Sequence, residues 1–178
     1  EVRELRPSVL GMMGFTGRDP QVLQEAKALA QKYIEDPTSV DPNVAGLVLN
    51  LAAVQGDEAL YNAYLAKLQG STAPEQFYRY AGALTSFRDP KLVERTLNAV
   101  LTPAVRSQDM AGSLFGLMGD EETRDIAWNF FKTHFAEIDK KAGGGLGGGY
   151  GGIASVFCSE GAKQDVEQWF TQHPDPTP

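Results

Sequence analysis

The sequence contains 178 residues, of which 42% are hydrophobic and 22% charged, and this is the composition of a globular domain that can bury a core. The net charge at pH 7 is −7, with 16 Lys and Arg residues scattered among 23 Asp and Glu residues, so binding to nucleic acid or to an anionic membrane surface is not expected. No apolar run approaches the ~20 residues that a membrane-spanning helix needs, and the single cysteine, Cys158, excludes an intrachain disulfide.

The N-terminal part of the chain has the periodicity of amphipathic helices. A first helix is expected over residues 3–14. In the second, expected over 20–35, apolar residues recur at helical spacing from Val22 to Ile34 and so share one face. The sequence Arg-Asp-Pro at 18–20 marks its start, because an Asp N-cap accepts hydrogen bonds from free backbone N–H groups and Pro has no N–H to leave unsatisfied.

Similar boundary signals recur along the chain. Asp-Pro returns at 41–42 and 89–90, and Gly-Asp-Glu occurs at 56–58 and 119–121. They divide the chain into helical pairs, expected at 3–14 with 20–35, 42–54 with 57–69, 74–86 with 90–101, 106–117 with 121–136, and 152–158 with 161–172. The second helices begin roughly 30–40 residues apart, which is typical of α-solenoid repeats. The sequence therefore predicts an all-α fold, a HEAT- or armadillo-like α-α superhelix of about five helical hairpins, forming one domain over residues 1–178.

The polar segment Ala104–Met110, AVRSQDM, lies at the start of the fourth pair. Its residues Arg106, Gln108 and Asp109 fit two interpretations. They can cap and bridge the start of a helix, which is the favoured interpretation, or they can face a cavity on the concave side of a solenoid.

A glycine-rich stretch follows, with eight glycines between Gly143 and Gly152. It matches the G-x-G-x-x-G spacing of dinucleotide-binding loops, but such matches are nearly guaranteed in so dense a run. No strand precedes it, and no G-K-[ST] sequence is present. A flexible connection between two helices is therefore favoured over a nucleotide site.

The sequence has no pattern of a metal site or a catalytic nucleophile. The two histidines, His134 and His173, are far apart, and there is no H-E-x-x-H motif or cysteine pair. His134 is expected at a helix C-terminus. Cys158 ends an apolar run and is expected to be a buried, inert thiol, since no basic residue lies close in the sequence to activate it. We expect no catalytic residue and no metal ligand in this chain.

Seven segments of the chain, in their order and spacing, resemble those of a known protein family. They are LRPSVLGMMGFTGRDPQVLQEAKALAQKY, DPNVAGLVLNLAAVQGDEALYNAYLAKLQ, YRYAGALTSFRDPKLVERTLNAVL, VRSQDM, AWNFFKTHFAEI, AGGGLGGGYGGIASVFCSEG and DVEQWFTQHP. In this order and spacing they resemble the C-terminal helical domain of zinc aminopeptidases of the aminopeptidase N type. VRSQDM is similar to the family's I-R-x-Q-D turn. His134-Phe135 departs from the Asn-Trp of the family's A-W-x-F-x-x-x-N-W segment, and the glycine stretch is longer than in most relatives.

The resemblance implies that the chain is a fragment of a longer aminopeptidase, without the family domain's first helices and its last one. The parent would use zinc to remove N-terminal residues from peptides, with its ligands and general base in upstream H-E-x-x-H…E and G-A-M-E-N motifs. This chain would be a non-catalytic domain, inactive alone, that caps the active-site chamber and limits substrate access. Its partners would be the upstream catalytic domain and the peptide substrate, and Arg106, Gln108 and Asp109 would be candidates for the chamber wall.

The alternative is a free-standing α-solenoid that binds a protein partner. The sequence carries no targeting signal, so a cytoplasmic, periplasmic or secreted parent stays open.

Overall fold

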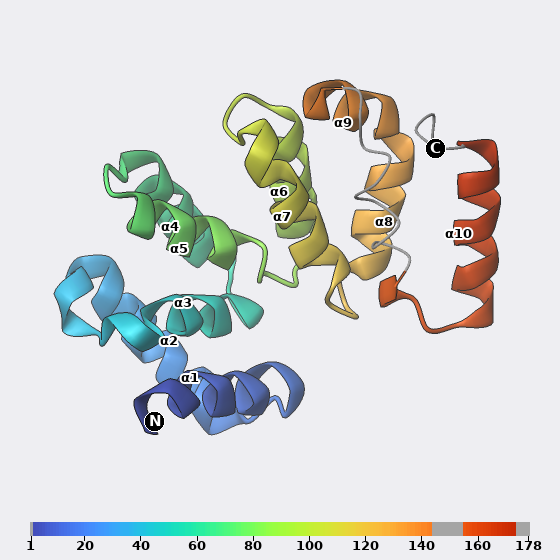
Figure 1. Ribbon diagram of the computed structural model, residues 1–178. Coiled ribbons are helices and arrows are strands. Elements are labelled where there is room, and N and C mark those ends of the chain that lie inside the picture. The colour runs from blue at the N-terminus through green and yellow to red at the C-terminus, as the bar shows by residue number, and fades with distance from the viewer. Residues whose placement is uncertain (1, 144–154, 174–178) are drawn as a thin grey trace. The chain divides into compact units, whose positions relative to one another are not determined.

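The computed structural model describes residues 2–143 and 155–173, with side chains from residue 5 onward. These residues form helices and no strand, so the all-α prediction is confirmed (Figure 1). None of the described helices is long and apolar enough to cross a membrane. The helices are α1 (Val2–Gly11), the π-helix η1 (Met12–Thr16), α2 (Pro20–Glu35), the 3-10 helix η2 (Pro37–Ser39), α3 (Pro42–Val54), α4 (Glu58–Gly70), α5 (Pro74–Leu84), α6 (Pro90–Leu101), α7 (Ser107–Met118), α8 (Arg124–Thr133), α9 (Phe135–Ala142) and α10 (Glu160–Gln172).

Aspartate side chains cap the starts of four helices, as the sequence predicts. Asp19 accepts from the backbone N–H groups of Gln21 and Val22 at 2.9 and 3.0 Å at the start of α2. The equivalent bonds at α3, α4 and α6 are accepted by Asp41, Asp57 and Asp89. Each such cap contributes about 1 kcal/mol to the stability of its helix. These boundaries are local in origin, because donor and acceptor lie two or three residues apart.

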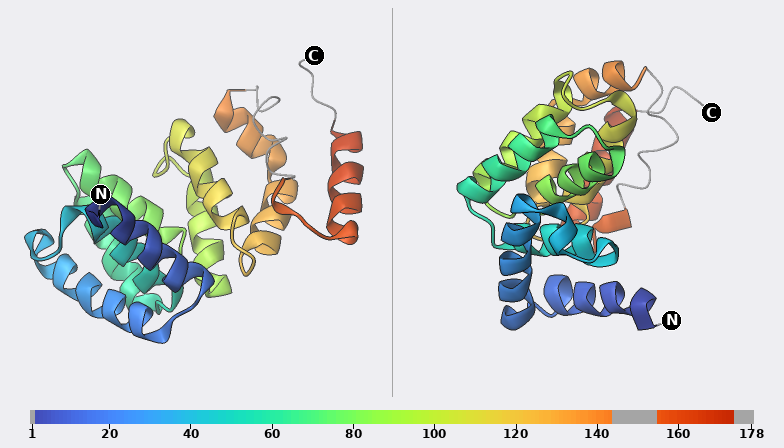
Figure 2. Two further views of the ribbon diagram at one scale, coloured as in Figure 1. Left: turned by 60° about the horizontal axis from the view of Figure 1, so that its bottom comes forward. Right: turned by 90° about the vertical axis from the view of Figure 1, so that its left-hand side faces the viewer.

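The chain divides into two compact units, residues 1–96 and residues 97–178. In the first unit α3 is central, because α1, α2 and α5 all pack against it, while α4 packs against α5 (Figures 1 and 2). Contact on several sides explains why α3 is apolar nearly all round. Its buried residues are Val44, Ala45, Val48, Leu49, Leu51, Ala52 and Ala53.

Aromatic side chains fill the space between α2, α4 and α5 in the first unit. The rings of Tyr33 and Tyr64 lie 6.1 and 5.6 Å from the ring of Tyr80. The hydroxyl of Tyr64 donates a hydrogen bond to the carbonyl of Leu49 at 3.0 Å. The hydroxyl of Tyr80 is equally buried, yet it has no hydrogen-bond partner among the described residues.

Replacement by phenylalanine is expected to change the free energy of unfolding differently at Tyr64 and at Tyr80. Tyr64→Phe removes a buried hydrogen bond and is expected to lower the free energy of unfolding by about 1 kcal/mol. Tyr80→Phe removes a hydroxyl that is buried without a partner, and it is expected to leave stability unchanged or to raise it by up to about 1 kcal/mol. Urea denaturation followed by circular dichroism measures both. A loss of stability in Tyr80→Phe that equals the loss in Tyr64→Phe would contradict the difference.

Both tyrosines also make the fold sensitive to alkali. Burial, followed by the neighbouring Tyr33, raises the pKa of Tyr80 to about 12 from its ordinary 10.0, and burial raises the pKa of Tyr64 further. Between pH 10 and 12 the unfolded chain therefore loses protons that the folded chain keeps. The stabilisation is complete below pH 10 and is lost as the pH rises through the folded values.

In the second unit α7, α8 and α9 pack against one another. Their contact surfaces bury large apolar side chains that are less than 2% exposed, namely Met110, Leu114, Leu117, Met118, Phe131 and Ile138. This unit holds the polar segment that the sequence analysis singles out.

The single helix predicted over 121–136 is wrong. Asp120 accepts from the backbone N–H of Glu122, so it caps a turn, and α8 begins only at Arg124. The turn is also held by the buried hydroxyl of Thr123, which donates to the carbonyl of Leu117 six residues earlier at 2.5 Å. At His134 the backbone leaves the helical region (φ −108°, ψ 18°), and a separate helix, α9, follows.

Of the described part of the helix predicted over 152–158, only residues 155 and 156 are helical, in 3-10 conformation, and residues 157 and 158 are not helical. Residues 152–154 and the glycine run from 144 onward lie outside the described residues. Gly143 ends α9 with a left-handed φ of 92°, a conformation that favours glycine. α10 begins at Glu160, where the hydroxyl of Ser159 accepts from the backbone N–H of Ala162.

Candidate functional site

The polar segment before α7 is held by an ion pair. Arg106 is the N-cap residue of α7, with an extended backbone. Its Nε donates to Oδ2 of Asp109 at 2.6 Å, and Asp109 lies in the first turn of α7, where the helix dipole favours a carboxylate. The Arg106 side chain is half-exposed, whereas that of Asp109 is mostly buried.

The structure therefore brings together two of the three predicted residues. Gln108 is exposed on the same turn of α7. The geometry agrees with the bridging part of the first interpretation, because Asp109 orients the Arg106 guanidinium, but the N-cap residue Arg106 makes no side-chain capping bond. The side chain of Arg106 is half-exposed and that of Gln108 is exposed, so both carry N–H donors at the surface of the second unit.

A lysine from another helix secures the chain just before this segment. The ammonium of Lys141, in α9, donates to the backbone carbonyls of Val100 and Thr102 at the end of α6. The carbonyls at a helix C-terminus lack intrahelical partners, so a lysine there both satisfies them and interacts favourably with the dipole. Burial lowers the pKa of Lys141. Sequence reasoning missed this residue, because it lies about 40 positions from its acceptors.

Aromatic and charged groups hold α10 against α8. Oδ2 of Asp165 accepts from Nε1 of Trp128 at 2.6 Å and from Nζ of Lys132 at 2.7 Å. These two hydrogen bonds, that of Lys132 first, lower the pKa of Asp165. The ring of Trp169 lies 5.6 Å from Trp128 and 5.3 Å from Phe131. These side chains contact one another and hold α10 in place, so we interpret the cluster as structural.

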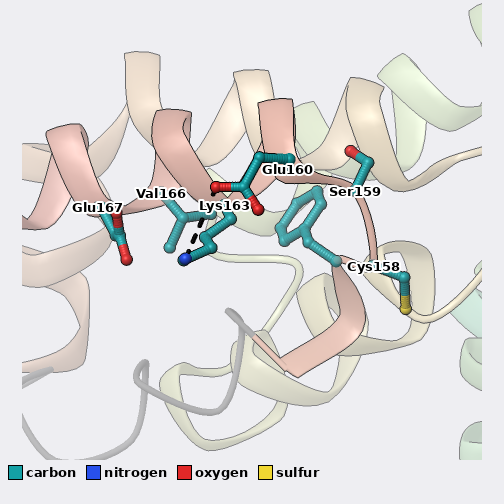
Figure 3. Close-up of a pocket in the computed structure, with 7 residues that line it drawn as sticks. Cys158, Ser159, Glu160, Lys163, Val166 and Glu167 are labelled. Carbon is teal, nitrogen blue, oxygen red and sulfur yellow. Dashed lines mark ion pairs between the residues drawn. The ribbon is translucent and has the colours of Figure 1, made fainter.

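A pocket of about 360 Å³ lies at the start of α10 (Figure 3). Phe157 and Val166 form its apolar part, and Glu160 pairs with Lys163 at 3.6 Å. Cys158 also lines the pocket and is exposed, so the prediction of a buried thiol is wrong. The apolar run before it does not continue as a helix that would carry the thiol into the core. The described lining has no histidine, so it offers no thiol–imidazole pair for catalysis.

The described residues do not fit a metal centre. They contain no group of three or more His, Cys, Asp or Glu side chains that could hold an ion. Nδ1 of His134 lies 3.1 Å from Glu137, at the junction of α8 and α9. His173 stacks on Trp169, and its Nδ1 lies 2.9 Å from the carbonyl of that residue. Both imidazoles therefore lie at helix ends and contact residues three or four positions away.

Comparison with protein families gives a match over the whole chain. The model of the ERAP1-like C-terminal domain matches residues 1–178.

Curated proteins with similar sequences are aminopeptidases. Aminopeptidase M1 of Arabidopsis thaliana is 27% identical over 97% of this chain and 20% of its own length. Probable aminopeptidase 2 of Sulfurisphaera tokodaii is 33% identical over 61% of the chain and 14% of its own length. The mitochondrial aminopeptidase 2 of Saccharomyces cerevisiae is 26% identical over 62% of the chain and 11% of its length. The chain thus spans a fifth or less of each relative.

Proposed function

This chain belongs to the family of ERAP1-like C-terminal domains, and from that premise we propose that it is the non-catalytic C-terminal domain of a zinc-dependent aminopeptidase. Its role is to cap the active-site chamber and to limit the access of peptides. The observation that carries the proposal is the family match over all 178 residues, joined to the small share of each aminopeptidase relative that the chain spans.

The chemistry of the chain supports a non-catalytic role. The sequence has no H-E-x-x-H motif, and the described residues do not fit a metal centre. Zinc and the residues that bind it would therefore belong to the upstream catalytic domain of the same polypeptide. We include in the proposal that the helices continue as a HEAT-like solenoid, whose concave side faces the substrate peptide.

The segment before α7 is our candidate for the chamber wall. Arg106 and Gln108 offer donors to a peptide, while the bond to Asp109 and the attachment of Lys141 to Val100 and Thr102 keep the segment in place. Residues on such a wall contact long substrates and leave the first residue of the substrate to the catalytic domain.

The test replaces Arg106, Gln108 and Asp109 by alanine in the full-length parent. The value of kcat/KM for peptides of about eight to ten residues is expected to fall roughly 3–10-fold, the loss expected for one or two polar contacts. Hydrolysis of an aminoacyl-nitroanilide, which is too short to reach the wall, is expected to change less than about twofold.

The matched control is the double replacement of Glu160 and Lys163 by alanine, which removes another exposed ion pair between residues three apart at a helix start. This double replacement is expected to leave the hydrolysis of both the peptides and the nitroanilide unchanged. If the replacement of Arg106, Gln108 and Asp109 lowered kcat/KM equally for the peptides and for the nitroanilide, the chamber-wall role would be contradicted. A nitroanilide activity that the isolated chain sustains and that a chelator abolishes would overturn the non-catalytic role.

A further inference from the structure

The connection from α6 to α7, residues 102–106, is held at its start by a side chain from a distant part of the sequence. Nζ of Lys141, in the last turn of α9, donates to the carbonyl of Val100 at 2.5 Å and to that of Thr102 at 2.7 Å. These two bonds span 41 and 39 positions of the sequence. Figure 1 shows α9 beside the connection, so Lys141 ties the end of α6 to α9.

Among residues 102–105 the hydrogen bonds join near neighbours. The hydroxyl of Thr102 donates to the carbonyl of Ala99 at 2.8 Å and accepts from the backbone N–H of Ala104 at 3.2 Å. The carbonyl of Thr102 also accepts from the backbone N–H of Val105 at 3.3 Å. Residues 102–104 are exposed, and a segment with few buried contacts has low local stability. The local bonds give this turn its shape, while the bonds from Lys141 fix its place in the second unit.

The start of α7 depends on the connection that precedes it. Arg106 is the N-cap residue of α7, and its side chain makes no capping hydrogen bond there. The first backbone N–H groups of a helix lack intrahelical partners, so a helix start without a side-chain cap loosens easily. Movement of Thr102 is therefore expected to reach Arg106, which is four residues further on.

We propose that Lys141 is a positioning residue for the chamber wall, which places Arg106 for contact with a peptide without itself contacting the peptide. This inference rests on the proposed function, which assigns Arg106 to the wall. The charge of Lys141 is part of the role, because the last carbonyls of α6 carry the negative end of the helix dipole. Lys141 thereby contributes to the selection of long peptides, although it lies outside the polar segment that forms the wall.

Two neighbouring lysines of α9 provide a matched pair of variants in the full-length parent. Lys141→Met removes the ammonium and keeps an unbranched side chain, and Lys140→Met makes the same change at an exposed residue. The quantity measured is kcat/KM for peptides of about eight to ten residues divided by kcat/KM for the aminoacyl-nitroanilide, which we call the peptide ratio. Lys141→Met is expected to lower the peptide ratio by about 3–5-fold, mainly through a higher KM for the peptides, because a wall contact binds ground state and transition state alike. Lys140→Met is expected to leave the peptide ratio unchanged.

Two further measurements separate positioning from a general structural role. Lys141→Arg keeps the charge and the N–H donors, and it is expected to keep the peptide ratio within about twofold of the unsubstituted enzyme. In a parent whose Arg106, Gln108 and Asp109 are already alanine, Lys141→Met is expected to lower the peptide ratio no further, because the residues that it positions are gone.

Hydrogen exchange measured by mass spectrometry shows whether the fold survives the change. Lys141→Met is expected to raise the exchange rate of residues 102–110 at least about threefold and to leave the rates of α3 and α8 unchanged. Faster exchange in α8 as well would show that Lys141 supports the whole second unit, and this would overturn the inference.

The kinetic outcomes distinguish this inference from the proposed function. Equal peptide ratios in Lys141→Met and Lys140→Met would overturn the inference, and so would a further loss from Lys141→Met in the triple-alanine parent. If the triple-alanine parent nevertheless showed a lowered peptide ratio, the chamber wall would stand without Lys141. An unchanged peptide ratio in the triple-alanine parent would remove the chamber wall itself, and the positioning role with it.

Discussion

Replacing Phe87 by alanine is expected to lower the free energy of unfolding by about 3–5 kcal/mol, the usual cost of emptying a large aromatic site in a core. Phe87 is fully buried, and its ring meets the rings of Tyr61 and Tyr64 edge-on at 5.1 and 5.8 Å. The cavity would lie between α4 and α5, beside Gly56. Urea denaturation monitored by circular dichroism measures the loss, and a change below about 1 kcal/mol would contradict the role of Phe87 in the core.

Gly56 provides an internal check on this prediction. A Cβ at Gly56 would overlap the Phe87 ring, so Gly56→Ala alone is expected to destabilise the chain. In the Phe87→Ala background the ring is gone, and the same substitution is expected to cost less. A double-mutant cycle measures this coupling. Tyr78→Ala, at a half-exposed tyrosine, is the control and is expected to cost no more than about 1 kcal/mol.

Trp169→Ala is expected to detach α10 from the second unit. The indole is 7% exposed and lies against Trp128, Phe131 and Phe135, with the Phe135 ring at 4.9 Å. Loss of this ring is expected to cost about 3–5 kcal/mol. Hydrogen exchange measured by mass spectrometry should show the loss of protection first in α10, because the hydrogen bonds of Asp165 then remain its main attachment to α8.

The control is Gln168→Ala, at the exposed neighbouring position on the same helix. This substitution is expected to leave the hydrogen-exchange rates of α10 equal, within experimental error, to those of the unsubstituted chain. If Trp169→Ala also left exchange in α10 unchanged while lowering the stability of α3, the aromatic contacts would not be what holds α10.

The sequence predicted helix boundaries well wherever a boundary is made by neighbouring residues. The starts of α2, α3, α4 and α6 lie where Asp19, Asp41, Asp57 and Asp89 predict them, because each cap joins groups two or three residues apart. The same reasoning was wrong at Asp120. Its local signal is equally clear, yet Asp120 caps a turn, which Thr123 and Leu117 also close by a hydrogen bond, and α8 begins only at Arg124.

In the candidate site, too, the sequence predicted the contact between neighbouring residues and missed the contacts between distant ones. The segment Ala104–Met110 was singled out by its polar residues, and the pairing of Arg106 with Asp109 agrees with a spacing of three on a helix. Lys141, which secures the chain before this segment, gave no signal in the sequence. The exposure of Cys158 was likewise not predicted, because it depends on where the chain before α10 leaves the helical conformation.

The sequence by itself determined the all-α class, most helix starts and the family, since these depend on periodicity, capping and the order of segments. The tertiary structure alone decided the attachment of Lys141 to Val100 and the bond from Trp128 to Asp165. The partners in these contacts lie 37–41 residues apart in the chain, and no local pattern specifies which of many possible partners will meet. Packing of the helices selects them, because only one arrangement buries the apolar faces and satisfies the polar groups together.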